Sequence, residues 1–415
     1  MNAVLMVAYH FPPLVGSSGI QRTLRFAQQL PQRGWQPIVL TVHPRAYERI
    51  AACTAAPESF PVIRAQAWDA ARHLSVAGRY PRVLAQPDRW SSWRWDATLR
   101  GLAAIRRHRP TAIWSTFPIA TAHVIAHALA RRSALPWIAD FRDPMAQDDY
   151  PSDPRQRAAY QALERQVVAH ATASVFVSPS ALSQARQRHP DHAERMLMIE
   201  NGYDDAMVAA THGHCKPTNR TGHLTVLHSG IVYPSERDPS ALIEALARLK
   251  ASAPEIFGRI RLRFRGAIHE DHLAQLVDRH AVNEAVEILP ICSHDEAVQE
   301  MACADGLLVL QATNCNAQIP AKYYEYLACR RPLLLLTDPQ GDTACAARAA
   351  GIEAIAPLSD AQAIASLLTR FVASPEDGTR AREEAVLQAA RSRRSDALAD
   401  LLDRVAGTAD RRANT

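Results

Sequence analysis

Short apolar runs alternate along this chain with stretches in which apolar residues recur at the spacing of a helix. In the first half, the apolar runs with the character of buried strands are Val4–Ala8, Pro37–Thr41, Ala112–Ser115, Trp137–Asp140, Ser174–Val177 and Met196–Glu200. The helical stretches between them are Ile20–Gln32, Trp93–Arg107, Ile119–Arg132 and Arg155–His170. This alternation predicts an α/β fold with a parallel sheet.

A second series of the same kind begins near Leu224. Its predicted strands are Leu224–His228, Ile260–Arg265, Val286–Leu289, Gly306–Leu310 and Leu333–Leu336. Its predicted helices are Pro239–Ala251, Glu270–His280, Ser293–Ala302 and Ala361–Val372. A stretch rich in His, Thr, Gly and Pro separates the two series and is typical of a linker. We therefore predict an N-terminal lobe over 1–205, a linker over 206–222, a C-terminal lobe over 223–377, and a helical segment with a polar tail over 378–415.

Composition adds limits to this organisation. A chain of 415 residues is too long for one ordinary core. No apolar run reaches the roughly 18 residues that span a bilayer, and the N-terminus lacks the features of a signal peptide. Seven scattered cysteines without a C-x-x-C pair fit a reducing compartment and no structural zinc. We expect a cytoplasmic protein that can associate with the cytoplasmic face of the inner membrane.

Positive charge is concentrated in the first half. Residues 1–210 hold 24 Arg and no Lys against 16 acidic residues. Such a half can steer an anionic acceptor or rest on an anionic membrane, and it can equally be an ordinary solvated surface. Within it, the three Trp and two Arg of Asp88–Trp95 suit a membrane interface or a sugar ring, but also a packed helix start. No nucleic acid partner is expected.

The segment Ile319–Pro332 places a lysine and a carboxylate on one face at the start of a short helix, with a buried strand directly after it. A helix N-terminus favours anions, so Lys322 can add charge for a phosphate. Glu325, one turn on, can accept hydrogen bonds from sugar hydroxyls. Phosphate and polyol side by side suggest a nucleotide-sugar, whereas a surface ion pair between the two residues is the alternative.

A Gly- and Ser-rich loop follows the first predicted strand and opens a helix. Backbone N–H groups of Gly16, Ser17, Ser18 and Gly19 can approach a ligand oxygen there, unless the loop is a plain turn. It is neither a dinucleotide fingerprint nor a P-loop, because G-x-G-x-x-G and G-K-[ST] are absent.

Charged residues also gather where the strand Trp137–Asp140 ends. Asp140, Arg142 and Asp143 would point into the crevice at the carboxyl edge of the sheet, where Asp143 can contact acceptor hydroxyls or orient a neighbour. A structural Asp–Arg pair is the alternative. His123, near the start of the preceding helix, can touch donor or acceptor. His123 and His127 are four residues apart, but without an adjacent Glu and a third ligand they are weak evidence for a zinc site.

The first two strands of the second lobe end in a similar way. Gly230 permits a close approach, and Arg237 lies before a helix start where a pyrophosphate would fit, unless it merely pairs with Asp238. Arg265 and Gly266 follow the next strand with the same logic and less specificity.

Together these segments resemble the GT-B glycosyltransferases of the large retaining family 4 group, above all bacterial enzymes that build surface polysaccharides on a lipid carrier. The motifs that carry the resemblance are, in chain order, Tyr9–Pro13 with Gly16–Gly19, Asp140–Pro144, Asn201-Gly202 and Pro320–Pro332. The resemblance implies two Rossmann-like lobes with parallel sheets facing across a cleft, a nucleotide-sugar donor in the second lobe and a glycan or lipid-linked saccharide acceptor in the first. It also implies that no cofactor or metal is needed.

The resemblance and the residue patterns together give three sets of candidates. The candidate catalytic residues are Asp143, His123, Arg237 and Lys322. The candidate donor-binding residues are Gly16, Ser17, Ser18, Gly19, Gly230, Arg265, Gly266, Lys322 and Glu325. The candidate acceptor residues are Asp140 and Arg142.

Two positions depart from the pattern of the family. Glu325 lies where the second Glu of the E-x7-E element falls, the residue that in such enzymes binds the ribose, but the first Glu would fall at Ala317. The usual Gly-Arg pair reads Gly230-Ile231, and Arg237 lies close to the usual phosphate-binding Lys. Ala317 therefore keeps open the alternative of a catalytically weak assembly subunit that binds sugar-nucleotides. A sugar-nucleotide epimerase of the same fold is a further alternative.

Overall fold

The structure, a computed structural model, describes residues 2–15, 19–51, 59–145, 147, 151–211 and 222–413. It divides into two compact units, which we call unit 1 (Met1–Asn201 with Ser392–Thr415) and unit 2 (Gly202–Arg391). The predicted donor residues Gly16, Ser17 and Ser18 lie outside the described residues.

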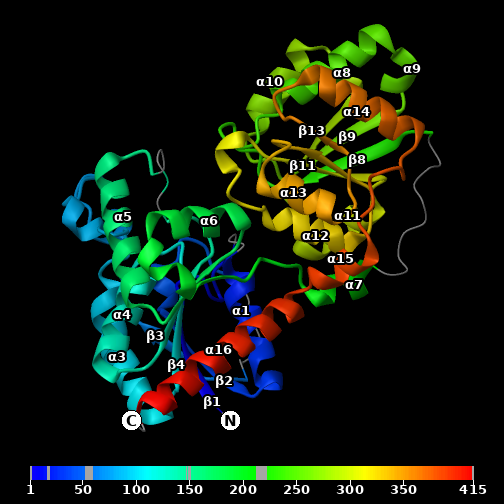
Figure 1. Cartoon of the computed structure of the whole chain (residues 1–415). Helices are drawn as coiled ribbons and strands as arrows, with labels where there is room; N and C mark the ends of the chain where they lie inside the picture. The colour runs from blue at the N-terminus through cyan, green and yellow to red at the C-terminus, as the bar shows by residue number, and fades with distance from the viewer. Residues whose placement is uncertain are drawn as a thin grey trace. The chain divides into compact units, whose positions relative to one another are not determined.

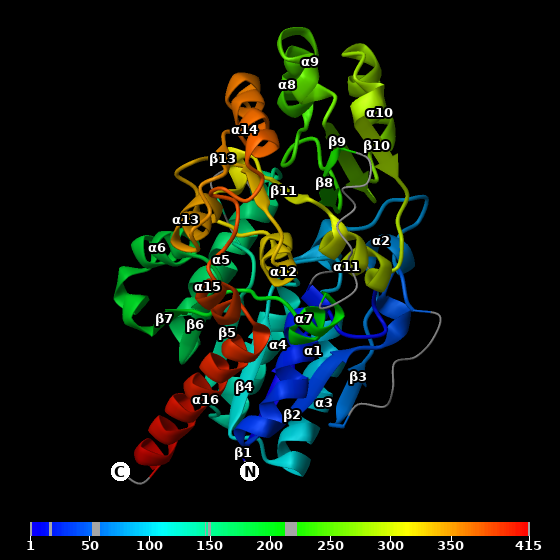
Figure 2. The ribbon, with the colours of Figure 1, turned by 90° about the vertical axis from the view of Figure 1, so that its right-hand side faces the viewer.

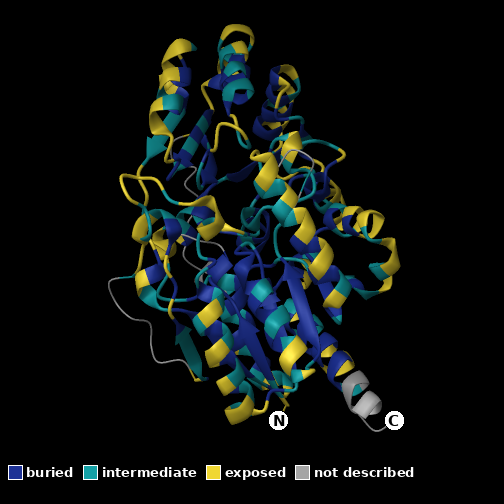
Figure 3. Ribbon diagram, turned by 90° about the vertical axis from the view of Figure 1, so that its left-hand side faces the viewer, coloured by how far each residue is buried: buried dark blue, intermediate teal, exposed yellow. Residues whose placement is uncertain are grey.

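Unit 1 is built on a seven-stranded, wholly parallel sheet with the order β3-β2-β1-β4-β5-β6-β7. Its strands are β1 (Asn2–Val7), β2 (Trp35–Val42), β3 (Val62–Ala65), β4 (Ala112–Thr116), β5 (Trp137–Phe141), β6 (Ala173–Phe176) and β7 (Met196–Met198). The central strands are continuous apolar runs because helices cover both of their faces. Figure 3 shows these strands as buried and the outward faces of the helices as exposed.

Two groups of helices cover the sheet of unit 1. They are α1 (Gly19–Gln29), α2 (Ala70–His73), α3 (Trp93–His108), α4 (Thr121–Ser133), α5 (Pro154–His170), α6 (Pro179–Arg188) and α16 (Arg391–Ala413). One core cluster contains the buried residues of α3 to α6, and a second contains those of α1 and α16. The C-terminal helix α16 therefore supplies part of the core of unit 1, and it runs along this sheet in Figures 1 and 2.

Specific contacts fix α16 in unit 1. Trp35 donates from Nε1 to the Asp403 carboxylate at 2.9 Å, and Arg33 pairs with Asp396 at 2.6 Å. Leu398 and Leu402 are buried in the same cluster as Trp35. The helix thus returns from unit 2 to complete the core of the unit in which the chain began.

Unit 2 repeats the design with a six-stranded parallel sheet of order β10-β9-β8-β11-β12-β13. Its strands are β8 (Leu224–Ser229), β9 (Ile260–Arg265), β10 (Val286–Leu289), β11 (Gly306–Leu310), β12 (Leu333–Leu336) and β13 (Ile355–Ala356). Its helices are α7 (Asp205–Thr211), α8 (Ser240–Ser252), α9 (Pro254–Phe257), α10 (Glu270–Arg279), α11 (His294–Cys303), α12 (Ala321–Cys329), α13 (Asp342–Ala349), α14 (Ala361–Ala373) and α15 (Glu383–Gln388). The predicted α/β class with parallel sheets is confirmed, and the fold is GT-B.

In both sheets, the chain adds strands first on one side of the first strand and then on the other. In unit 1 the strand order reverses between β1 and β4, and in unit 2 between β8 and β11. Open α/β sheets bind ligands in the crevice outside the carboxyl ends of the strands at such a point. The loops after β1, β4 and β5, and those after β8 and β11, are therefore where functional side chains are sought.

Some features differ from the sequence prediction. The short strands β3 and β13 were not predicted, and the last helical segment is two helices, α15 and α16. Cys292, Cys329 and Cys345 are free thiols, whereas Cys303 is disulfide-bonded, which differs from the expectation of a reducing compartment. Within the described part of the chain, no helix combines the length and the apolar character needed to cross a bilayer.

Candidate functional site

Lys322 and Glu325, at the start of α12, form the ion pair that was the alternative to a nucleotide-sugar site. Lys322 Nζ lies 2.8 Å from Glu325 Oε2, and the side chains are 32% and 21% exposed. Glu325 Oε2 makes no hydrogen bond among the described residues, so the contact is an ion pair without hydrogen-bond geometry. Pro320, the N-cap of α12, supplies no side-chain cap. No side chain caps the N–H groups in the first turn of α12, so the positive end of the helix dipole lies beside the Lys322 ammonium.

The carboxyl end of β8 lies directly against this helix start. Gly230 has φ of +144°, and a Cβ built on it would come 3.5 Å from Lys322 Cε. The Tyr326 hydroxyl accepts a hydrogen bond of 2.9 Å from the Ser229 N–H, which pins α12 to the end of β8. Gly230 and Lys322, predicted from segments far apart in the chain, are therefore brought together.

Arg237 approaches the same place from the loop after β8. Its Nη1 donates to the Ile231 carbonyl at 2.9 Å, and its guanidinium lies over the Tyr233 ring. His228, buried at the end of β8, contacts the Leu308 carbonyl through Nδ1 at 2.9 Å. Burial, with the charges of Arg237 and Lys322, lowers the pKa of His228 to about 4. A neutral imidazole thus lies beneath the two cations and adds no charge of its own.

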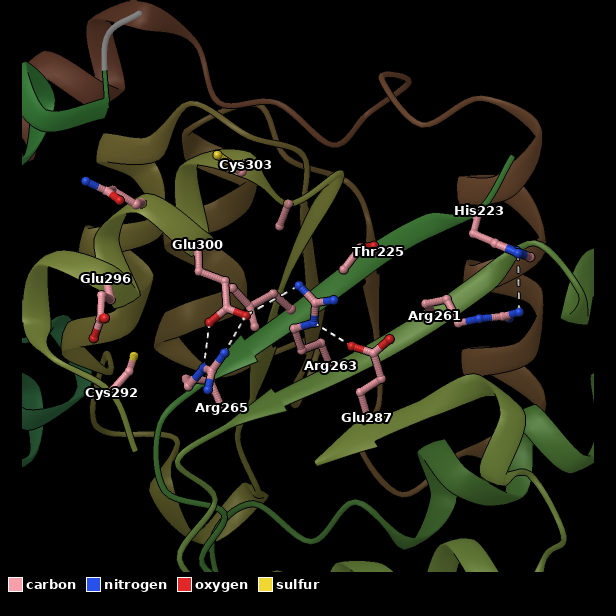
Figure 4. Close-up of a pocket in the computed structure, with 13 residues that line it drawn as sticks. His223, Thr225, Arg261, Arg263, Arg265, Glu287, Cys292, Glu296, Glu300 and Cys303 are labelled. Atoms are coloured by element: carbon pink, nitrogen blue, oxygen red, sulfur yellow. Dashed lines mark hydrogen bonds and ion pairs between the residues drawn. The ribbon is translucent and has the colours of Figure 1, made fainter. Parts of the chain in front are cut away.

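Arg265 and Gly266, at the end of β9, have different surroundings. Arg265 makes two contacts with the Glu300 carboxylate, at 2.7 and 3.0 Å, and lines a pocket of about 810 Å³ (Figure 4). That pocket lies over the outward face of β9, so the guanidinium is neutralised there by Glu300. Gly266 has φ of +66°, which explains the glycine, and a Cβ built on it would come 3.3 Å from Ile291 in the loop after β10. Their donor-binding role stays a prediction.

In unit 1, Asp140 is part of an internal network. Its side chain is fully buried, and its two oxygens accept hydrogen bonds of 2.7 and 3.0 Å from Arg22 and one of 2.8 Å from Thr116. Arg22, 4% exposed, also donates to the carbonyls of Ile199 and Glu200. The predicted acceptor contact of Asp140 therefore needs correction, because no carboxylate oxygen reaches the surface. Asp140 instead holds the arginine that fixes the chain where it leaves unit 1.

Arg142 and Asp143 form the structural pair that was the alternative reading, but with one arm left over. Asp143 Oδ2 accepts from Arg142 Nη2 at 2.9 Å. Arg142 Nη1 is buried and has no hydrogen-bond partner among the described residues. A Cβ built on Gly19 would lie 2.0 Å from this Nη1 and 2.6 Å from His10 Nδ1, so only glycine fits at the start of α1.

His10 completes this cluster in unit 1. Burial and, next, the charge of Arg142 lower its pKa to about 3, and Asp143 opposes the shift. The cluster of His10, Gly19, Arg142 and Asp143 therefore combines a neutral imidazole, a guanidinium arm and a helix start at the carboxyl ends of β1 and β5.

His123 lies elsewhere. It is fully buried, its Nδ1 is 2.8 Å from the Ser115 hydroxyl, and its ring packs against Phe141. Burial lowers its pKa to about 3. Its predicted contact with donor or acceptor needs correction, since the neutral ring is a core side chain between α4 and the sheet.

Sequence reasoning missed Arg22, His10, His228 and Tyr326. Only Tyr326 and His10 were within motifs that had been singled out for the resemblance, and neither carried a role. The described residues contain no group of three or more His, Cys, Asp or Glu side chains that could hold a metal ion. That no metal or cofactor is needed stays a prediction.

The sequence of unit 1 matches a known family model. Residues 18–202 match the family model described as a glycosyl transferase 4-like domain. Unit 1 is thus similar to a glycosyl transferase 4-like domain over most of its length. The resemblance to family 4-like GT-B glycosyltransferases that the sequence indicated is thereby confirmed. No curated protein matches the chain.

Solved structures that are similar to this chain cover both of its units. Sucrose-phosphate synthase of Thermosynechococcus elongatus matches with a TM-score of 0.71 and 13% identity, over 98% of this chain and 100% of that one. Trehalose 6-phosphate synthase of Burkholderia multivorans matches with 0.67 and 14%, over 99% and 98%. Anabaena HepE, in a complex with UDP and glucose, matches with 0.65 and 14%, over 97% and 100%. At these identities, the likeness establishes the fold.

Proposed function

We propose that this glycosyltransferase moves a sugar, with retention of its anomeric configuration, from a nucleotide-sugar to a glycan or lipid-linked saccharide in the synthesis of a cell-surface polysaccharide. The observation that carries the proposal is the meeting of Gly230, Lys322 and Glu325 at the uncapped start of α12. Further support comes from the similar fold of HepE, which was solved with UDP and glucose.

Each part of this arrangement suits one part of a donor. The helix start and the Lys322 ammonium favour a diphosphate, and the missing side chain of Gly230 leaves room for it. Arg237 adds a second cation to the same locus, since its charge acts on His228 together with that of Lys322. Glu325, one turn deeper along α12, accepts hydrogen bonds from the hydroxyls of a ribose.

The chemical task is to stabilise negative charge on the leaving diphosphate. The acceptor oxygen forms a bond to the anomeric carbon as the bond to the phosphate oxygen breaks, and the acceptor proton passes to the departing phosphate. Lys322, Arg237 and the α12 N–H groups would lower the barrier by meeting charge that grows in the transition state. No side-chain nucleophile or metal is required by this route.

In unit 1, the cluster of His10, Gly19, Arg142 and Asp143 is the group that we assign to the acceptor side. Asp143 is 37% exposed and can contact a hydroxyl of the acceptor, whereas Arg142, only 12% exposed, orients Asp143. His10 stays uncharged at neutral pH because its pKa is about 3. Neither Asp140 nor His123 takes part directly.

A thermal-shift panel of UDP-, GDP-, ADP- and dTDP-sugars tests the donor site, because a ligand that binds only the folded state raises its melting temperature. Glu325→Ala is the test variant. Glu284→Ala is its matched control, since Glu284 also pairs with a lysine of unit 2, Lys250, at 2.6 Å. We expect one nucleotide class to stabilise the wild type and Glu284→Ala but not Glu325→Ala. No stabilisation of the wild type by any of them would contradict the proposal.

Activity assays with the same nucleotide-sugars separate the transferase from the binding-subunit and epimerase alternatives. With membrane-derived acceptors added, transfer with retained configuration, followed by NMR of the product linkage, identifies the transferase. Conversion of the donor sugar without an acceptor would identify an epimerase. Nucleotide binding without either reaction would identify a binding subunit.

A further inference from the structure

Exposed apolar side chains gather in one stretch of unit 1. Between β3 and the middle of α3, the structure exposes Val76 by 81%, Val83 by 73%, Leu99 by 69% and Trp95 by 68%, together with Trp68 and Leu84. Monomeric proteins seldom leave large apolar side chains grouped in this way without a partner. We call these six residues, with Arg72, Arg79, Arg82 and Arg100, the Trp95 surface.

Hydrogen bonds tie the parts of the Trp95 surface together. The Ser92 hydroxyl, at the start of α3, contacts both the N–H and the carbonyl of Trp68 at 2.8 and 2.9 Å. The neighbouring Ser91 hydroxyl donates to the Leu84 carbonyl at 2.6 Å. Trp95 and Leu99 are one helical turn apart on α3 and so share a face. Trp68 and Leu84 are therefore held beside the start of α3, and Val76 and Val83 lie on the stretch of chain between Trp68 and Leu84.

The charge around these apolar residues is strongly positive. Residues 70–109 hold nine Arg and no Lys against two Asp. Asp88 is buried, and Asp96 is paired with Arg100 at 2.7 Å. Arg94 lies over the Trp95 ring at 4.6 Å. Amphipathic Trp rings and aliphatic side chains interleaved with arginines are the chemistry that enters the headgroup region of an anionic bilayer.

We propose that the Trp95 surface docks unit 1 on an anionic lipid bilayer, with Trp95, Leu99, Val76 and Val83 inserted among the headgroups and the arginines on lipid phosphates. This deepens the proposed function, on which it rests for its purpose, because a lipid-linked acceptor is presented at such a surface. The connection to the site is short. Trp90 directly precedes Ser91 and Ser92, whose hydroxyls contact Leu84 and Trp68. The Trp90 ring packs on Tyr9 with centroids 4.7 Å apart, and Tyr9 precedes His10 after the end of β1.

Co-sedimentation of the full chain with phosphatidylcholine vesicles, with and without about a third phosphatidylglycerol, tests this docking. The test variants are the pairs Trp95→Ser with Leu99→Ser, and Arg79→Glu with Arg82→Glu. The matched controls in unit 2 are Leu387→Ser, at a residue 51% exposed, and Arg279→Glu, at an exposed arginine. We expect the wild type and both controls to pellet with the anionic vesicles only, and each pair of substitutions to weaken partition by more than about tenfold.

The thermal-shift panel, run on the same variants, keeps the two proposals apart. Both paired variants should keep the melting temperature of the wild type and its response to the nucleotide, because the substituted side chains are exposed. A wild type that stays in solution with anionic vesicles would overturn the docking and leave the donor site untouched. Retention on an immobilised anionic polysaccharide without vesicle binding would also overturn it and assign the surface to a soluble polymer.

Discussion

The two units place charged residues at the same topological position and use them for different ends. In unit 1, Asp140 lies at the end of β5, and its side chain is fully buried with that of Arg22, which is 4% exposed. In unit 2, Lys322 and Glu325 stand at the equivalent carboxyl edge with 32% and 21% of their side chains exposed. The first pair has further hydrogen bonds to Thr116, Ile199 and Glu200, whereas the second has a single short contact. The hydrogen-bond partners of a charged residue, and not its position along the strand, decide whether it holds the fold together or can bind a ligand.

Asp140→Asn should produce the largest effect and would break the comparison if it did not. The substitution leaves the Arg22 guanidinium buried without its counter-charge, which costs about 3–5 kcal/mol of the free energy of unfolding. Urea denaturation measures this loss. Glu244→Gln removes the exposed Arg248 pair at 2.7 Å and should cost less than about 1 kcal/mol. A loss below that level for Asp140→Asn would show that the buried network does not hold unit 1.

The pH dependence of stability sharpens the comparison, because both units hold buried, neutral histidines. The pKa values of His10, His123 and His228 are lowered to about 3, 3 and 4. The unfolded chain takes up a proton at each near pH 6.5, while the folded chain does not, so stability falls as pH falls from about 6.5 toward 4. Each histidine contributes up to about 1.4 kcal/mol per pH unit.

Urea denaturation at pH 7.5 and at successively lower pH measures this dependence of stability on pH. A separate probe of unfolding is used for each unit. His123→Gln should make the slope shallower in unit 1 and leave that of unit 2 unchanged, and His228→Gln should do the reverse. Equal slopes in all three proteins would contradict the assigned neutral states.

Much of the fold was accessible from the sequence because parallel strands that are covered on both faces are continuous apolar runs. Strands β9 to β12 were predicted with the bounds observed. The edge strand β3 and the two-residue β13 were missed, since a run that short carries no periodicity. Helix α16 was predicted as helical, but its attachment to unit 1 depends on contacts such as Trp35 with Asp403, which lie 368 residues apart.

The candidate site was less accessible for the same reason. Gly230, Arg237, Lys322 and Glu325 could be proposed because strand ends and helix starts gather at one edge of a parallel sheet. Asp140 had the same local signature, and its burial is decided by Arg22, 118 residues away. His123 was misplaced because helical position does not tell which turn faces the sheet. Local pattern thus indicates where a residue lies along an element but not what it contacts.

The central claim is that the edge of unit 2, and not the charged network of unit 1, binds the donor diphosphate. Its most direct test is a calorimetric titration of the nucleoside diphosphate chosen by the thermal-shift panel into the wild type, Lys322→Ala and Lys250→Ala. Lys250 is the matched control, because it pairs with Glu284 in the same unit at 2.6 Å. A charge-assisted contact to phosphate predicts affinity lower by about tenfold or more for Lys322→Ala, with Lys250→Ala like the wild type. Equal affinity in all three proteins would contradict the assignment of the donor site.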